Sequence, residues 1–451
     1  LVRLTLFCSM LVLWQVQHSG ACFLWRYWRW LLPFSARIDI IFYIWYHAYQ
    51  ERLLWNFEVS KMADKNERSV YIGAVSGCNV ISAEKAVVPA NYSAVNSTTG
   101  HGLMAEEALT VIDKFSGRSA EVVGRTNIKN GPDRMVDGAA LQTKFYNSGK
   151  GCVQACFDKE NGGLYRYLNS DGSPMPVEVP KDMYDDAVEA FRAKISQGKV
   201  PGVTDVNEAG NYVRKSDLTY ADAMNLCKPF TAQSLLYDCA TGIIYCSFAF
   251  GISALAAFIL EYSRNGRNKK KALFSAVRTG AKVFGLSYVA HILCSQFART
   301  ELFKSVWDIT GYINSEGFFG GAVKSVNNAV RFSVGDSVSS VSASLTQFSK
   351  MFRAGIFMNL FTMLIFLVPD TVRVFVRDIS GFEYLNRVFM IVISRIFSTV
   401  FYITAALMLG SFSSLPYMVS MTVCLAASCI GGIAGRAVVS KLTERFMILR
   451  A

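Results

Sequence analysis

The feature that most constrains the fold of this chain is a series of long apolar runs in its C-terminal half. An α-helix needs about 20 residues to cross a bilayer, and residues 242–262 form an apolar run of that length. Further apolar runs cover residues 273–294, 355–368, 388–409 and 416–435. Only helices and closed barrels satisfy their backbone polar groups in lipid. The sequence therefore predicts an all-α, multi-span membrane region over residues 241–451.

Charged and small residues interrupt these runs. Arg278, Lys282 and Arg395 lie inside apolar segments. In a functional role these side chains line a pore or bind lipid headgroups. In a structural role they extend to the membrane interface or pair with residues of neighbouring helices. The last run carries three small residues, Gly431, Gly432 and Gly435. Small residues let helices approach closely, so we expect close helix packing there. One way to form it would be contact between copies of the chain in a homo-oligomer.

Charge and cysteine content restrict the partners and the redox state. The net charge of +12 suits an anionic partner, and bulk charge does not separate membrane phospholipid from nucleic acid. The 11 cysteines form no paired CxxC motif. Cys152 and Cys156 lie one helical turn apart, but no second pair completes a zinc set. We interpret the cysteines as reduced, packed thiols.

The first 99 residues fall into two segments. Residues 1–61 contain six of the seven tryptophans, and Met62 precedes a polar segment typical of an N-terminus. We predict that residues 1–61 are a non-native or upstream extension. The alternative is a membrane anchor, although its apolar run at 40–46 is shorter than the roughly 20 residues of a span. Residues 62–99 are polar and small, and we predict a flexible tail with at most one strand.

Residues 100–240 carry the patterns of a soluble domain. A helical apolar stripe covers 103–112, a strand is predicted at 120–123, and Val153–Phe157 fits either a strand or a helix. The remaining predicted elements are strands at 165–168 and 177–179, a helix from Pro180 to Ile195, and short helices near 206–214 and 220–227. The predicted fold class is an α/β domain of helix, mixed three- to four-stranded sheet and helix, followed by the membrane region.

A predicted hairpin at residues 133–146 carries the most specific polar pattern. Asp137-Gly138 lies between two apolar stretches, which is a strong signal for a tight hairpin turn. Asp133 opens the first strand. Gln142 and Lys144 lie two residues apart on the second strand, so their side chains share one face of it.

Oxygen ligands and a lysine on one hairpin suit metal-assisted phosphodiester chemistry. A divalent cation activates water and offsets phosphate charge, and Mg²⁺ binds a few protein oxygens while keeping waters. Asp133 and Gln142 are the candidate ligands for Mg²⁺, or for Mn²⁺. Lys144 would orient or help deprotonate the attacking water, and Glu106 on the preceding helix would hold a metal-bound water. The competing interpretation is an ordinary polar hairpin face.

These residues resemble the PD-(D/E)XK nuclease superfamily. Pro132-Asp133 matches the PD element, and Gln142-Thr143-Lys144 matches the (D/E)XK element with Gln in place of Glu, as in the Mrr-like and resolvase-like branches. Glu106 matches the helix acid of those branches. The resemblance covers residues 100–180 and implies a metal-dependent nuclease fold. Its departure is Gln142, which is neutral and supplies less affinity for a metal.

Several other polar residues are candidates for contact with nucleic acid. Lys129 and Asn130 precede the hairpin, and Lys181 begins the following helix; a plain loop and a solvated helix face are the alternatives. His101 either contacts DNA or a reacting group, or makes a hydrogen bond at the start of its helix. The chain is also similar to bacterial inner-membrane proteins of prophages, through Gly100–Glu106, Leu141–Lys144 and Val177–Lys181.

Two functions follow from these patterns. The first is a membrane-anchored, magnesium-dependent nuclease-like protein of the bacterial inner membrane, acting in defence against foreign DNA. The second is an integral membrane protein, a pore or an effector, whose catalytically inactive nuclease-fold domain senses or binds a ligand. Basic loops at 264–271 and 373–387 are expected in the cytoplasm. Five full spans would then put residues 62–240 outside, and a re-entrant segment at 242–262 would put them inside.

Overall fold

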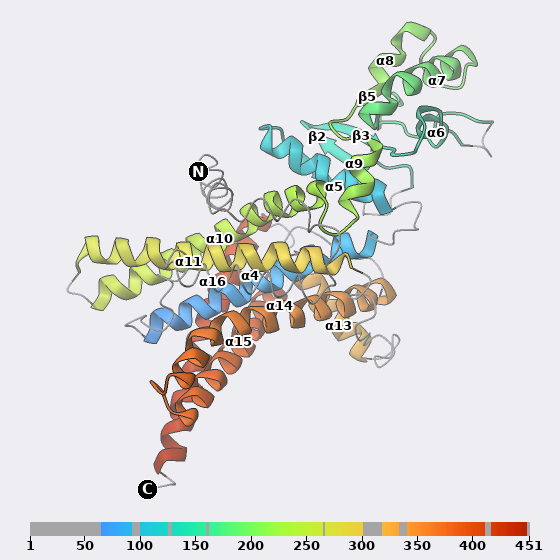
Figure 1. Ribbon diagram of the computed structural model, residues 1–451. Coiled ribbons are helices and arrows are strands. Elements are labelled where there is room, and N and C mark those ends of the chain that lie inside the picture. Colours follow the sequence, from blue (N-terminus) through green and yellow to red (C-terminus); the bar gives the residue numbers. More distant parts are fainter. Residues whose placement is uncertain are drawn as a thin grey trace, which may run out of the picture. The chain divides into compact units, whose positions relative to one another are not determined.

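The computed structural model describes residues 65–92, 100–124, 129–158, 162–264, 267–300, 318–332, 341–410 and 416–448 (Figure 1). The predicted fold class is confirmed: a small α/β domain is followed by a helical region. The predicted extension at residues 1–61 lies outside the described residues.

The α/β domain is built on one mixed sheet with the strand order β1-β2-β3-β4-β5. β1, β2 and β3 are antiparallel neighbours, whereas β4 and β5 run parallel to β3. The strands are β1 (Ala120–Val122), β2 (Arg134–Val136), β3 (Ala139–Thr143), β4 (Val177–Val179) and β5 (Val213–Lys215). The helices of the domain are α5 (Gly100–Phe115), α6 (Gly149–Gln154), η2 (Lys181–Met183), α7 (Tyr184–Ser196), η3 (Val206–Glu208), α8 (Ala209–Tyr212) and α9 (Tyr220–Leu226).

The predicted Asp-Gly hairpin is present. Asp137 and Gly138 both have positive φ, 50° and 81°, as a two-residue type I′ turn requires. Asp137 Oδ1 also accepts a hydrogen bond from Ser119 N at 2.8 Å, which ties the turn to β1. The turn sets the β2–β3 register, in which Arg134 pairs with Leu141.

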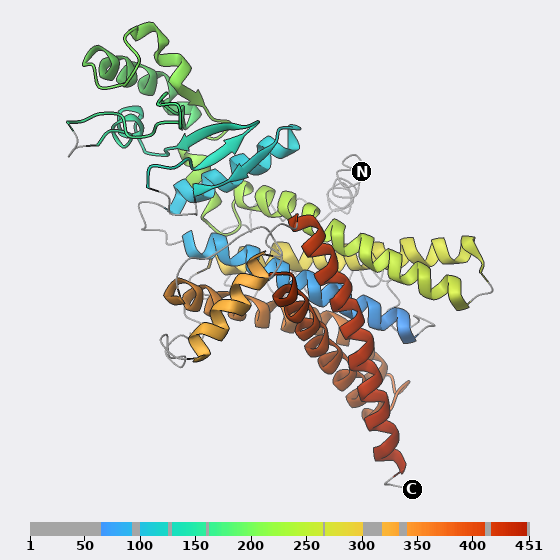
Figure 2. The ribbon, with the colours of Figure 1, turned by 180° about the vertical axis from the view of Figure 1, so that it is seen from behind.

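The two faces of the sheet have different covers. α5 lies along one face, where Thr110 Oγ1 accepts from Arg134 Nε at 3.0 Å. Figure 2 shows this helix, in cyan, beside the strands. The other face carries the main apolar core, in which Val177 and Val179 of β4 pack with Phe191 of α7. Because side chains alternate along a strand, each position of β2, β3 and β4 is assigned to one of these two faces.

The helical region contains four helices long and apolar enough to cross a membrane, counted over the part of the chain that the structure describes. These candidate spans are 232–264, 351–368, 381–409 and 418–443. The helices are α10 (Ala232–Arg264), α11 (Lys269–Ala298), α13 (Phe318–Phe332), α14 (Val341–Phe375), α15 (Gly381–Leu409) and α16 (Tyr417–Ile448). The predicted span at 273–294 lies in α11, which is not among the four.

The predicted flexible tail is wrong for residues 65–92, which form the helix α4 (Lys65–Tyr92). α4 packs against α10, α11, α14, α15 and α16, and Val70, Ile72 and Val75 are fully buried. In Figures 1 and 2 the blue helix runs among the later helices. The sequence pattern fails here because small and polar residues lower the hydropathy of α4, while its burial depends on helices far downstream.

Two smaller predictions are also corrected, and one open alternative is decided. The predicted helix near 206–214 is helical from Val206 to Tyr212, in η3 and α8, but it ends there because the chain enters β5 at Val213 and pairs with β4. Residues 165–168 form only isolated bridges, of Tyr165 with Phe157 and of Leu168 with Pro174. The segment left open at 153–157 is helical at its start, in α6, whose N-cap Ser148 accepts from Gly151 N at 3.1 Å.

The glycines of α16 pack against helices of the same chain. A Cβ at Gly432 would lie 2.5 Å from Ser69 O of α4, and a Cβ at Gly435 would lie 2.8 Å from Ser394 Cα of α15. Ser428 Oγ donates to Gly73 O at 2.8 Å across the α4–α16 contact. The predicted close packing is therefore intramolecular, and homo-oligomerisation stays a prediction.

Candidate functional site

The hairpin brings Asp133, Gln142 and Lys144 into direct contact. Lys144 Nζ donates to Asp133 Oδ2 at 2.6 Å and to Gln142 Oε1 at 2.7 Å. Asp133 Oδ2 also accepts from the backbone N–H of Thr143 at 3.0 Å, and Gln142 Nε2 donates to Gly131 O at 2.5 Å. The predicted shared face of Gln142 and Lys144 is therefore present, with Asp133 across the hairpin from both.

The cluster is only partly open to solvent. The side chain of Lys144 is 15% exposed and that of Asp133 is 21% exposed, whereas Gln142 is fully buried. Burial by itself lowers the pKa of Lys144, but the attraction of Asp133 outweighs it, so the pKa lies above the ordinary 10.5. Lys144 is therefore an ammonium at neutral pH, and its Nζ lies 5.0 Å from the ring centroid of Tyr167.

Among the interactions that the structure describes, none joins Glu106 to this cluster. The side-chain hydrogen bonds and the ion pair of Asp133, Gln142 and Lys144 go to one another and to backbone atoms of Gly131 and Thr143. Glu106 is buried on α5, and α5 covers the face of the sheet that carries Arg134. Because Asp133 precedes Arg134 by one residue, its side chain points to the opposite face.

The face below α5 holds a separate network of buried charges. Arg134 is fully buried and pairs with Asp113 of α5 and with Glu178 of β4. Arg214 lies 3.5 Å from Asp113 and 3.4 Å from Glu178. No local sequence pattern indicates this network, because it joins α5, β2, β4 and β5, which are distant in sequence. Its role is structural: it fixes α5 on the sheet.

The remaining candidate residues lie around the hairpin. Lys129 is exposed, and Asn130 has a positive φ of 61° in the turn that leads to Gly131. Lys181 is exposed at the end of β4, and its backbone N–H donates to Leu218 O at 2.9 Å. His101 is buried, with Nε2 2.8 Å from Phe145 O. That bond links the start of α5 to the chain just after β3, so His101 is a structural tie.

The donor set at the hairpin is sparse for a metal. Over the described residues, no group of three or more His, Cys, Asp or Glu could hold an ion. Asp133 and Gln142 provide two oxygens, which suits only a Mg²⁺ ion that keeps most of its waters. Lys144 bonds to the same Asp133 Oδ2 and Gln142 Oε1. A metal joining those two oxygens would therefore have to displace the ammonium.

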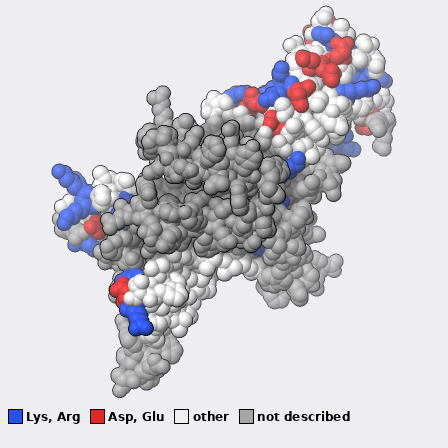
Figure 3. All heavy atoms as spheres, in the orientation of Figure 1, with Lys and Arg blue, Asp and Glu red and all other residues white. Residues whose placement is uncertain are grey.

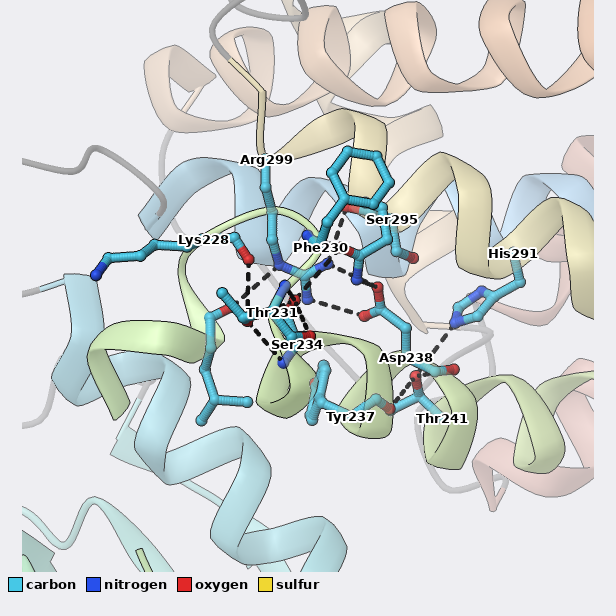
Figure 4. A network of polar contacts seen from close by, with 12 residues as sticks. Lys228, Phe230, Thr231, Ser234, Tyr237, Asp238, Thr241, His291, Ser295 and Arg299 are labelled. Atoms are coloured by element: carbon cyan, nitrogen blue, oxygen red, sulfur yellow. Dashed lines mark hydrogen bonds and ion pairs between the residues drawn. The ribbon is translucent and has the colours of Figure 1, made fainter. Parts of the chain in front are cut away.

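A second polar cluster, which no local sequence pattern indicates, joins α10 and α11 (Figure 4). Arg299 and Asp238 are both buried, and the guanidinium donates to the two carboxylate oxygens at 2.7 and 2.8 Å. Gln296 Nε2 donates to Asp238 Oδ2 at 2.6 Å. A bidentate pair of this kind is strong and geometrically specific.

The same cluster reaches back to the α/β domain. Arg299 Nε donates to Leu226 O at the end of α9 at 3.1 Å. Gln296 Oε1 accepts from the backbone N–H of Phe230, in the segment that links α9 to α10. The cluster therefore connects the last helix of the domain with two helices of the helical region.

Comparison with known proteins finds similarity over part of the chain. The family model of the YeeR C-terminal domain matches residues 83–196. The inner membrane protein YeeR of Escherichia coli (strain K12) is 44% identical over 101 residues, which cover 22% of this chain and 19% of that protein. No solved structure matches the chain. Together with the four candidate spans, this similarity places the protein in the bacterial inner membrane.

Proposed function

We propose that this chain is an integral membrane protein whose α/β domain binds a phosphate-bearing ligand without cleaving it. The observation that carries the proposal is the ion pair between Lys144 Nζ and Asp133 Oδ2 at 2.6 Å. It places a partly accessible ammonium beside one carboxylate and one amide. An ammonium is a common point-charge partner of phosphate, and a single carboxylate is a weak metal ligand set.

The protonation state of Lys144 also favours binding over hydrolysis. A general base must accept a proton near neutral pH, and the raised pKa of Lys144 keeps it protonated there. A phosphate oxygen would bind it by replacing Gln142 Oε1 or Thr143 O as the acceptor of one of its three N–H groups. The similarity to an inner membrane protein supports a membrane role and adds no support for a nuclease.

Charge bias across the membrane supports the same proposal. The turn between α10 and α11 carries exposed Arg264, Arg267 and Lys269–Lys271, and Figure 3 shows this blue cluster at the end of the helical hairpin. Such clusters favour the cytoplasmic side. If α10 crosses the membrane, the α/β domain at its other end lies outside, away from cytoplasmic DNA.

The contacts of α9 supply a route from the domain to the membrane helices. Arg299, the C-cap residue of α11, binds the carbonyl of Leu226 in α9 and the carboxylate of Asp238 in α10. A ligand that displaces α9 would strain this bidentate pair. We infer that the domain acts as a sensor whose bound state is passed to α10 and α11.

A binding measurement on the full chain in detergent tests the proposal. The probe is a fluorescent oligonucleotide, with inorganic phosphate as competitor, and the readout is fluorescence anisotropy. We expect Lys144→Ala to weaken binding at least fivefold, and Lys150→Ala, an exposed lysine on α6, to leave it unchanged. Equal affinities of wild type and Lys144→Ala, or no binding by the folded wild type, would reject the proposal.

Metal-dependent cleavage of DNA is the second candidate function. It is favoured by the convergence of Asp133, Gln142 and Lys144 on one face, as the nuclease resemblance implies, and a role in defence against foreign DNA belongs to it. Its test is cleavage of labelled DNA with Mg²⁺ or Mn²⁺. Cleavage by the wild type that Lys144→Ala abolishes would replace binding alone as the function. Uncut DNA with folded protein would eliminate this candidate.

A further inference from the structure

A second buried arginine in the helical region, Arg395, differs from Arg299 because none of its partners among the described residues is acidic. Arg395 is the fifteenth of the 29 residues of α15, at the middle of a candidate span, and it is 4% exposed. Ionisable residues at such a position are rare and mark pathways, relays or ligand sites. The partners of Arg395 therefore decide how its buried charge is balanced.

The partners of Arg395 in the described structure are all neutral. Nη1 donates to Asn359 Oδ1 of α14 at 2.6 Å. The guanidinium carbon lies 5.3 Å from the ring centroid of Phe366, also on α14. With its amide oxygen turned toward them, Asn79 of α4 accepts from Arg395 Nη1 at 3.1 Å and from Thr362 Oγ1 at 3.2 Å. Three helices thus meet at one cation, and no carboxylate is among its partners there.

Two nitrogens of Arg395 are buried without a hydrogen-bond partner, Nε and Nη2. Their N–H groups point along the same edge of the planar guanidinium. That edge matches the two oxygens of a carboxylate or a similar planar oxyanion, which accept two parallel hydrogen bonds. Arg299 shows the satisfied counterpart in this chain, with a bidentate aspartate and all three nitrogens bonded.

We infer that Arg395 is the binding group of an intramembrane site for a small monovalent planar oxyanion, a carboxylate or nitrate. The anion receives two hydrogen bonds from Nε and Nη2, while Asn359 and Asn79 hold the opposite nitrogen and fix the plane of the guanidinium. The site lies between α4, α14 and α15. It shares no residue with the hairpin cluster at Lys144, so a negative result for one site does not bear on the other.

Direct binding of an anion by the full chain tests this inference. The probe is [¹⁴C]formate, and scintillation proximity on the purified protein in detergent gives the bound amount. We expect saturable binding near one formate per chain in the wild type and at least a tenfold loss of affinity in Arg395→Gln. The matched control is Arg387→Gln on the same helix, where Arg387 pairs with Asp370 and Glu383; formate binding should be unchanged.

Competition identifies the source of the anion, and a second variant keeps the inference testable if Arg395→Gln does not fold. Nitrate that displaces formate indicates an anion from the aqueous phase, whereas displacement only by decanoate indicates a fatty acid from the bilayer. If Arg395→Gln does not fold, Asn359→Ala, which frees the plane of the guanidinium, should weaken binding several-fold. Absence of saturable binding by the folded wild type, or equal binding by Arg395→Gln, would overturn the inference.

Discussion

Replacing Arg134 by methionine should destabilise the α/β domain more than any other single change in its sheet. Arg134 is fully buried and holds Asp113 and Glu178, whose side chains are 4% and 2% exposed. Removing one member of a buried ion pair costs about 3–5 kcal/mol, because it leaves a buried charge uncompensated. Arg118, 3.1 Å from Asp113, and Arg214 remain nearby. Their partial compensation puts the expected cost near the lower limit, about 3 kcal/mol.

The thiol of Cys156 reports this loss in the intact protein. Cys156 is fully buried, and burial raises its pKa to about 12, so alkylation requires opening of the domain. A cost of about 3 kcal/mol raises the open fraction by roughly a hundredfold. Alkylation of Cys156 in full-length protein, followed by mass spectrometry, should accelerate accordingly. Arg192→Met is the control, since Arg192 is exposed and its ion pair in the described part of the chain is with exposed Glu189.

A second substitution separates charge from packing. In the double variant Arg134→Met with Glu178→Leu, one unpaired carboxylate is removed and apolar contact is added. Replacing both members of a buried pair by apolar residues is often neutral or stabilising. We expect the double variant to recover at least half of the loss. Labelling of Cys156 in Arg134→Met at the rate seen in Arg192→Met would refute the assignment of Arg134 as the central charge of the domain.

Three further predictions concern the same domain. Competitive acylation against pH should show that Lys144 titrates above its ordinary pKa of 10.5, so that its contribution to stability is complete below pH 10.5 and declines only as the pH rises through the higher folded value. Asp133→Asn removes the largest attraction that opposes burial, so the midpoint should fall; an unchanged midpoint would contradict the ion pair. Gly149→Ala should lower the free energy of unfolding by about 1–3 kcal/mol through overpacking, because its Cβ would lie 2.6 Å from the backbone oxygen of Met183, the N-cap of α7. Gly210→Ala is the control: its Cβ meets nothing within 4 Å, so thermal unfolding should be nearly unchanged. A cysteine at exposed Asp205 should react with a membrane-impermeant maleimide in intact cells, and protection until lysis would place the domain in the cytoplasm.

Local patterns made the hairpin predictable from the sequence. The turn depends on two adjacent residues, Asp137 and Gly138, and the shared face of Gln142 and Lys144 depends on a spacing of two. Neither requires knowledge of distant contacts. The contact of Lys144 with Asp133 then follows from the register that the turn imposes.

Features that depend on which elements meet were not predictable in this way. The sequence order, with α5 just before the hairpin, predicts that Glu106 joins the hairpin cluster, but the Arg134 network sets which side of the sheet α5 covers. The pair of Asp238 and Arg299 joins residues 61 positions apart. In the sequence, Asp238 and Arg299 each read as an ordinary charged residue near the end of an apolar helix.

The position of α4 in the helix bundle has a consequence for how the chain is made. α4 is synthesised before every helix that it packs against, and Ser428, which bonds to Gly73 O, lies 355 positions later. At about 5–20 residues per second, roughly 20–70 s separate the synthesis of these two partners. During that time α4 emerges, the α/β domain folds, and the binding surface for Gly73 does not yet exist. Among the described helices, α16 is therefore the last to cover α4, and a chain that stops before α16 would leave the face of α4 at Gly73 uncovered.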